Sequence, residues 1–127
     1  MIMSNPPDLA KKDLSRVNLA TANLAGADLH EASLRDATLK ETNLEGADLT
    51  SADLSHANLA GACLRNATAS HANMEDADLR DADLEGTNLR GAHLAGAKLG
   101  EAQRAAATAA GADFAAISGD GDAASDG

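Results

Sequence analysis

The chain has 127 residues, enough for one domain, and its formal net charge is −10 with a pI of about 4.5. Hydrophobic residues make up 44% of it, yet Phe114 is its one aromatic residue, and alanine and leucine supply most of the apolar side chains. Aromatic side chains usually carry much of a buried core, so the composition favours a narrow, repetitive core. Direct binding to nucleic acid is disfavoured, because phosphate contacts depend on Lys and Arg.

Residues 1–7 are expected to form an N-terminal cap. Pro6 and Pro7 stand just before the first repeat, and proline offers no N–H to a stacking partner. This end lacks the apolar stretch of a signal peptide, and no apolar run approaches the length of a membrane span. Cys63 is the single cysteine and cannot form an internal disulfide, which favours a reducing compartment. We therefore expect a cytoplasmic protein without a membrane contact.

Residues 8–101 are dominated by a five-residue repeat. From Leu9 to Leu99 every fifth residue is leucine except Ala69 and Met74, which gives 17 leucines in 19 positions. The residue two before each centre is alanine in 14 of the 16 repeats from Ala22 to Ala97, and the residue just before the centre is Asp or Asn in 13 of 19. Glycine recurs two positions after the centre. Such self-similarity predicts a repeat architecture.

A period of five fits neither a helix nor a flat strand. On an α-helix the leucines would encircle the axis, and on a strand every second leucine would face the wrong side. All of them point inward only if the chain turns a corner once per repeat, at the positions where glycine tolerates a positive φ. The pattern predicts an all-β fold, a parallel β-helix whose crossovers are right-handed.

The tandem units GADLH, TANLA, SADLS, DADLE and GTNLR resemble those of pentapeptide-repeat proteins. The resemblance covers about three quarters of the chain. It implies a right-handed quadrilateral β-helix with four repeats per coil, so that residues n and n+20 stack, here in about five coils. It also implies that the family's best-understood members act as DNA mimics on type II topoisomerases, whereas most other members have no assigned function. This chain departs from those members in having leucine rather than Phe-rich centres and no inserted loop.

The repeat decays after Leu99, and residues 102–117 are expected to be a degenerate repeat or a capping segment. A continued register would place Arg104 in the apolar bore, where an unpaired charge is costly. The sequence EAQRAAATAA favours a short capping helix ending before Gly111, and one repeat-like unit resumes around Phe114. Residues 118–127 are small and acidic and are expected to be a disordered tail.

Neither catalysis nor cofactor or metal binding is expected of this chain. Ser55 precedes His56 and Ser70 precedes His71, but neighbouring residues on a coil diverge and a catalytic triad requires convergence. Stacking at n+20 aligns Asp36, His56 and Asp76, whose side chains would project in parallel, whereas metal ligands converge. We therefore expect no enzyme activity, no cofactor and no metal site.

Acidic residues are the outward feature with the clearest functional interest. They are expected to wrap three sides of the fourth coil, with Arg80 the one opposing charge inside that coil, Arg65 below it and Lys98 above it. This acidic band consists of Glu75, Asp76, Asp78, Asp81, Asp83 and Glu85. Charge at this density usually serves solubility, and its alternative role is to bind a basic protein surface.

Two functions remain open from the sequence. The first is a non-catalytic protein-interaction module, a rigid acidic rod of DNA-like width that presents its band to a basic protein, such as a type II topoisomerase. The second is a structural or self-assembling scaffold without a role related to nucleic acid. An Ala-rich stretch, residues 101–117 with Phe114 and Ile117, could form either a homodimer interface or a monomeric cap.

Overall fold

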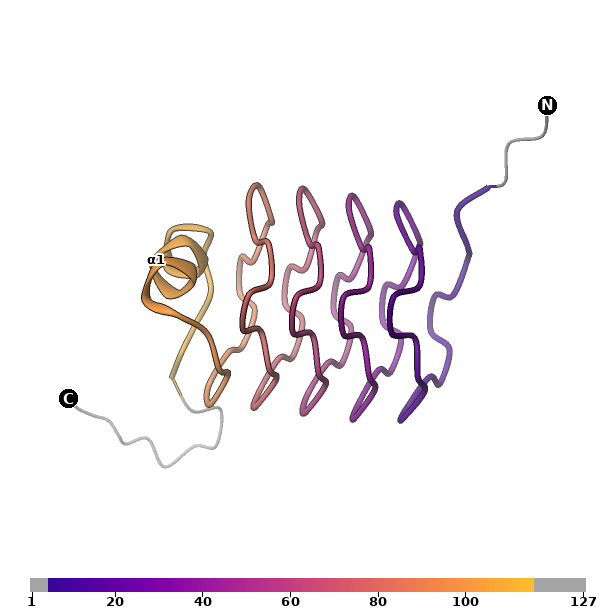
Figure 1. Ribbon diagram of the computed structural model, residues 1–127, viewed down its shortest axis with the longest axis horizontal. Coiled ribbons are helices and arrows are strands. Elements are labelled where there is room, and N and C mark those ends of the chain that lie inside the picture. Colours follow the sequence, from indigo (N-terminus) through magenta and orange to yellow (C-terminus); the bar gives the residue numbers. More distant parts are fainter. Residues whose placement is uncertain (1–4, 116–127) are drawn as a thin grey trace.

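A computed structural model describes residues 5–115. The repeats form a stack of coils, and helix α1 (Glu101–Ala109) follows them at the C-terminal end (Figure 1). The expectations for residues 1–4 and for the acidic tail lie outside the described residues. Helix α1 lies within the segment for which we expected a capping helix. No helix of residues 5–115 is long and apolar enough to cross a membrane.

The register of the coils is set by parallel bridges between residues twenty apart. Asp28 pairs with both Asp8 and Asp48, and the same offset continues to the pair of His93 with Asp113. Each bridge is isolated rather than part of a longer strand, because the chain turns after every repeat. The stacking of residue n on residue n+20, which gives four repeats per coil, is therefore confirmed.

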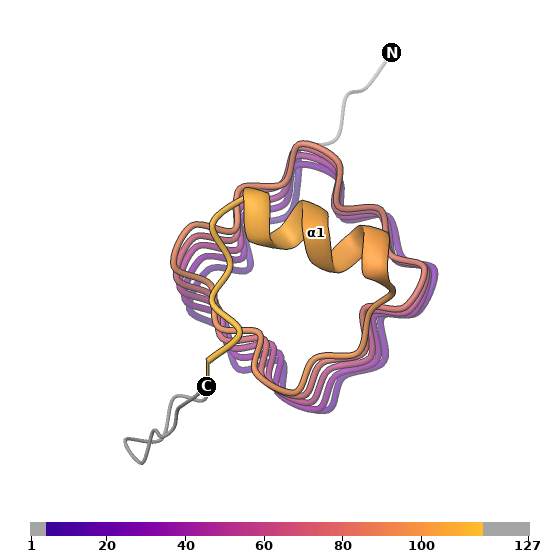
Figure 2. The ribbon, with the colours of Figure 1, turned by 90° about the vertical axis from the view of Figure 1, so that its left-hand side faces the viewer.

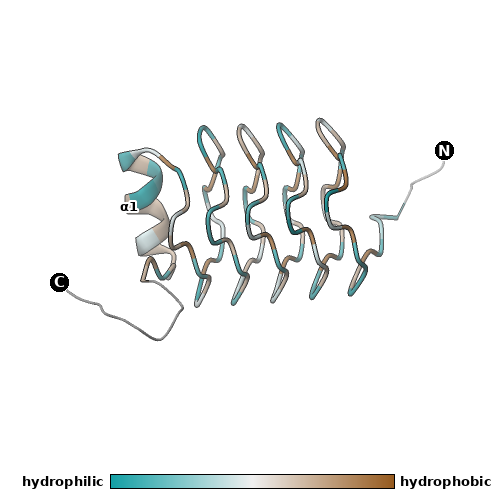
Figure 3. Cartoon of the chain, turned by 90° about the horizontal axis from the view of Figure 1, so that it is seen from below, coloured by the Kyte–Doolittle hydropathy of each residue, from teal (hydrophilic) through white to brown (hydrophobic). Residues whose placement is uncertain are grey.

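The core consists of two inward rows, as the alternation of alanine and leucine predicts. Leu44, Leu64, Ala47 and Ala62 are all buried, with exposed fractions of 1% or less. Figure 3 shows hydrophobic and hydrophilic segments alternating along each coil. Leu9, Leu14 and Leu19 of the first coil remain only partly buried, because no coil covers their outer side.

Each corner is a hydrogen-bonded turn. The N–H of Ala32 donates to the carbonyl of Leu29 over 3.0 Å, and the same bond recurs along the chain. The residue two after each repeat centre from Leu9 to Leu94 has a positive φ, from 58° to 76°. A positive φ at the third position of a β-turn is the type II geometry. The expectation that glycine marks these corners is confirmed, although twelve of them hold other residues.

The Asp or Asn before each centre has a structural role that the sequence pattern did not reveal. Its side-chain oxygen accepts the backbone N–H two residues further on, as in Asp48 with Thr50 and Asn58 with Ala60, both over 3.0 Å. Such Asx turns fix the start of a corner. Since Asn accepts this bond as well as Asp does, the repeat constrains the residue type but not the charge.

Helix α1 lies across the C-terminal end of the stack (Figure 2). Its Gln103 side chain donates to the carbonyls of Leu79 and Ala82 over 2.8 and 2.6 Å, which ties the helix to the coil beneath it. Arg104 is exposed rather than in the bore, with its guanidinium 4.0 Å from the centre of the Phe114 ring. This cation–π contact joins the helix to the repeat-like unit that follows it.

Candidate functional site

The acidic band spans successive corners and sides of one coil. Glu75, Asp76, Asp81 and Glu85 occupy corners, whereas Asp78 and Asp83 precede repeat centres on the sides. Asp76, Asp81 and Glu85 are exposed, and the other three acids are partly exposed. The corner of Asp76 is held by a bond from its N–H to the next coil as well as by the turn bond of Ala77, whereas the corner of Asp81 is held by the turn bond from the N–H of Ala82 to the carbonyl of Leu79.

Half of the band is paired within the chain. Arg80 donates to both carboxylate oxygens of Asp78, over 2.9 and 2.7 Å. Arg65, from the coil below, lies 3.1 Å from an oxygen of Asp83 and 2.6 Å from one of Glu85. These contacts compensate Asp78, Asp83 and Glu85 and reduce the charge they offer to a partner.

Two of the paired carboxylates, those of Asp78 and Asp83, have lowered pKa values. The hydrogen bond from Arg80 lowers the pKa of Asp78 to about 2, with the nearby Lys98 charge acting in the same direction. The pKa of Asp83 is lowered chiefly by the backbone N–H of Glu85 and then by Arg65. Each of these two carboxylates therefore accepts the backbone hydrogen bond of an Asx turn and also forms an ion pair with an arginine.

The other half of the band has no arginine or lysine partner among residues 5–115. Glu75, Asp76 and Asp81 lie more than 4 Å from every described Lys or Arg nitrogen, and the closest basic group to Asp76 is His56, at 3.7 Å. These three acids occupy two adjacent corners, and Asp76 and Asp81 are exposed there. They are the part of the band that remains available to a basic partner.

The serine–histidine neighbours do not form a nucleophile–base pair. Ser55 is buried, donates to Asp53 over 2.6 Å and accepts a bond from Arg35 over 2.9 Å. His56 is exposed and points toward Asp76. The stacked group of Asp36, His56 and Asp76 is no metal site either. Its three possible ligand atoms do not all lie within 4.8 Å of one another, whereas those of one other group of residues do.

That other set was missed by the sequence reasoning. Ligand atoms of Asp28, His30 and Asp48 lie within 4.8 Å of one another, and His30 Nδ1 lies 2.6 Å from Asp28 Oδ1. The hydrogen bond to Asp28 raises the pKa of His30, and the same bond lowers the pKa of Asp28. The spacing i, i+2, i+20 contains the signal, but it can be interpreted only once the coil length is known.

The His30–Asp28 pair predicts a measurable pH dependence. A raised histidine pKa gives stability that is complete below the unfolded value and is lost as pH rises through the folded pKa. A lowered aspartate pKa gives stability that is lost as pH falls through its own folded pKa. We expect an NMR titration to place the His30 pKa above its ordinary value and Asp28→Asn to bring it down. An unchanged His30 pKa in that variant would contradict the pairing.

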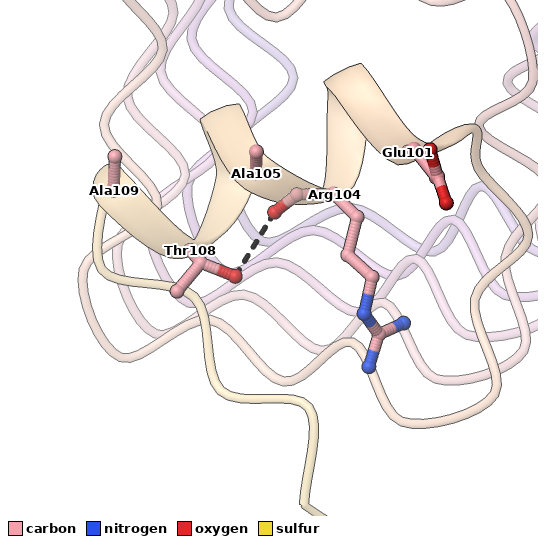
Figure 4. Close-up of a pocket in the computed structure, with 5 residues that line it drawn as sticks. All are labelled: Glu101, Arg104, Ala105, Thr108 and Ala109. Atoms are coloured by element: carbon pink, nitrogen blue, oxygen red, sulfur yellow. Dashed lines mark hydrogen bonds between the residues drawn. The ribbon is translucent and has the colours of Figure 1, made fainter.

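The exposed face of α1 carries a pocket. Its lining consists of Glu101, Arg104, Ala105, Thr108 and Ala109 (Figure 4). The Thr108 hydroxyl is occupied, since it donates to the carbonyl of Arg104 over 2.9 Å. The pocket therefore offers small apolar methyl groups together with the Arg104 guanidinium and the Glu101 carboxylate.

The five-residue repeat and the coils stacked at n+20 are the features expected of pentapeptide-repeat proteins. The family model for the pentapeptide repeat region matches residues 12–94, and the chain belongs to this family. Its fold is the right-handed quadrilateral β-helix, and its members are generally non-catalytic. A search of curated proteins found no match.

Solved structures with this fold come from several sources. A pentapeptide repeat protein from the thylakoid lumen of Arabidopsis thaliana is 30% identical, with a TM-score of 0.63 over 91% of this chain and 84% of that chain. One from the cyanobacterium Cyanothece 51142 is 43% identical over 67% of this chain and 61% of that one, with a TM-score of 0.48. The plasmid-mediated fluoroquinolone resistance protein QnrB1 is 18% identical, with a TM-score of 0.34 over 76% and 69% of the two chains. The last two likenesses are too low in TM-score to carry a functional argument.

Proposed function

We propose that this chain is a non-catalytic protein-interaction module that presents its acidic band to a basic protein surface. The observation that carries the proposal is the set of acids Glu75, Asp76 and Asp81 on two adjacent corners, which have no Lys or Arg nitrogen within 4 Å among residues 5–115. Fixed charges on a rigid wall steer a complementary surface without an entropic cost of ordering. The proposed compartment is the cytoplasm, on the basis of the unpaired Cys63.

The sharper form of the proposal is mimicry of duplex DNA toward a type II topoisomerase. A DNA-binding groove recognises a regular series of negative charges on a stiff rod, largely through long-range electrostatics. The acidic band provides such charges at fixed spacing. The partner in this form of the proposal is therefore a protein that itself binds DNA. A supercoiling assay with purified gyrase tests this form directly, and an absence of inhibition at micromolar protein would exclude it.

A triple variant tests the acidic band itself, and it combines Glu75→Gln, Asp76→Asn and Asp81→Asn. We expect association with the partner to slow markedly and to lose much of its salt dependence, while dissociation changes little. The fold should persist, because Asn and Gln are outward at these corners and Asn tolerates the positive φ of positions 76 and 81. Surface plasmon resonance at several salt concentrations measures both rates.

A matched control removes three acids from the opposite wall. Asp8→Asn, Glu31→Gln and Asp48→Asn change the net charge equally and keep the Asx turns of residues 8 and 48. If this control slows association as much as the band variant does, only total charge matters and the band is not a site. If neither variant changes binding, the alternative function, a structural or self-assembling scaffold, would be favoured.

A second candidate function is self-assembly through the C-terminal segment. The exposed alanines of α1 and the pocket beside Arg104 favour it, since small side chains permit close packing of a second copy. Light scattering of the full chain distinguishes the two proposals. A dimer that becomes a monomer on Ala105→Glu would support a homodimer through α1, whereas a concentration-independent monomer would exclude it.

A further inference from the structure

One wall of the β-helix gathers three potential metal ligands. Asp28 precedes a repeat centre and points outward, His30 opens the following turn, and Asp48 is stacked on Asp28 by a parallel bridge. One nitrogen of His30 and one oxygen from each aspartate lie within 4.8 Å of one another. The column of Asp28 and Asp48 lies two sides of the coil from that of Asp78 and one side from that of Asp83. Along the stack, Asp48 lies two bridges before Asn88, the residue of this column that follows the acidic band.

The electrostatics of this wall favour a bound cation. Asp8, Asp28 and Asp48 follow one another in a single column of bridges, and like charges directly opposite each other in a ladder are destabilising. Within residues 5–115 no Lys or Arg nitrogen lies within 4 Å of the Asp28 or Asp48 carboxylate, and His30 is the single ionic partner of Asp28. The neighbouring Glu31 adds further negative charge. A divalent ion would compensate charges that the protein leaves uncompensated.

Geometry distinguishes this group from a second one with the same composition. Asp36, His56 and Asp76 also combine two aspartates with one histidine at stacked positions. They all come from the same corner column, so their side chains project in parallel; His56 and Asp76 approach to 3.7 Å, but the three residues do not bring one ligand atom each within 4.8 Å of one another. In the first group the histidine comes from the corner and both aspartates from the side, and this allows convergence.

We propose that Asp28, His30 and Asp48 bind one divalent transition-metal ion such as Zn²⁺, with water completing its coordination. Imidazole nitrogen together with carboxylate oxygen suits this class of ion. Ligand atoms at ~2 Å from Zn²⁺ stand roughly 3 Å apart around it, so His30 Nδ1 and Asp28 Oδ1 need to separate only slightly from their present 2.6 Å. The ion takes the place of the proton that the two atoms now share.

The surrounding backbone holds two of the ligands in position. The carboxylates of Asp28 and Asp48 each accept the N–H two residues on, over 3.2 and 3.0 Å. Bonds of this kind orient a ligating carboxylate, and in Asp28 the oxygen that accepts the bond, Oδ1, is also the one that faces His30 Nδ1. The site is thus built on rigid backbone and requires only a small rotation of side chains.

Calorimetry with ZnCl₂ on the full chain tests the proposal, with Cys63→Ser as the common background to remove the thiol. We expect one ion per chain, and at least a tenfold loss of affinity in both His30→Gln and Asp48→Asn. His56→Gln is the matched control, since it removes a histidine from the parallel group, and it should bind as the background does. Circular dichroism confirms that each variant keeps the fold.

Imidazole NMR signals supply a second readout. Zn²⁺ should shift or broaden the His30 signals at one equivalent and leave those of His56, His71 and His93 unchanged. The proposal is wrong if the background protein binds no Zn²⁺ at millimolar concentration, or if His56→Gln loses as much affinity as His30→Gln. It is equally wrong if another histidine responds first. None of these outcomes bears on the acidic band, which is tested with a different variant and a different partner.

Discussion

Replacing Leu64 with alanine is expected to lower the free energy of unfolding by about 2–4 kcal/mol. Leu64 is fully buried between Leu44 and Leu84, which occupy the same inward column. The backbone ladder above and below it is continuous, so the coil can relax little into the space left by the smaller side chain. Chemical denaturation followed by far-UV circular dichroism measures the loss.

Leu64→Asp should have a larger effect, because an unpaired charge in the bore disrupts both neighbouring coils. Leu14→Ala is the matched control, since Leu14 is a repeat centre in the first coil and is only partly buried. Its substitution should cost clearly less than that of Leu64. Equal losses at the two positions would show that stacking between coils does not determine the stability of the core.

The fold was predictable because one physical constraint acts on every repeat. A leucine at every fifth position can be buried throughout only by a chain that turns once per repeat. The resemblance to pentapeptide-repeat proteins added that four such turns make a coil, and the bridges at n+20 agree with it. Gly26 and Gly46 marked the corners for the same reason, since both have a positive φ. The path of α1 was less predictable, because the anchoring bonds of Gln103 depend on carbonyls more than twenty residues earlier.

The candidate sites depend on detail that the repeat does not encode. The acidic band could be located by counting residues, but which of its acids are free follows from the conformations of Arg65 and Arg80. The pair of Asp28 and His30 was overlooked because i, i+2 neighbours normally point to the same face of a strand without converging. Here the corner begins between them, and the turn brings the imidazole back toward the carboxylate.

Gly111→Ala is expected to release the C-terminal cap. Gly111 has a φ of +101°, and an added Cβ would lie 2.8 Å from Cα and 3.3 Å from N of Arg90, two backbone atoms that cannot move aside. The Gly111 carbonyl also accepts the N–H of Gly91 over 3.1 Å. Displacing it breaks this bond and separates α1 from the coil beneath. Strain of this kind costs about 1–3 kcal/mol, and the lost packing of Ala107 and Phe114 adds to it.

Amide hydrogen exchange locates the effect of Gly111→Ala. Protection should fall at Leu89 and Gly91, whose N–H groups donate to residues 110 and 111, and remain unchanged in the coils around Leu44. Gly46→Ala is the matched control, because φ there is +68° and nothing lies within 4 Å of an added Cβ. It introduces the left-handed strain alone, about 1 kcal/mol. If both substitutions cost the same, with no local loss of protection near Gly91, then contact with Arg90 does not hold the cap in place.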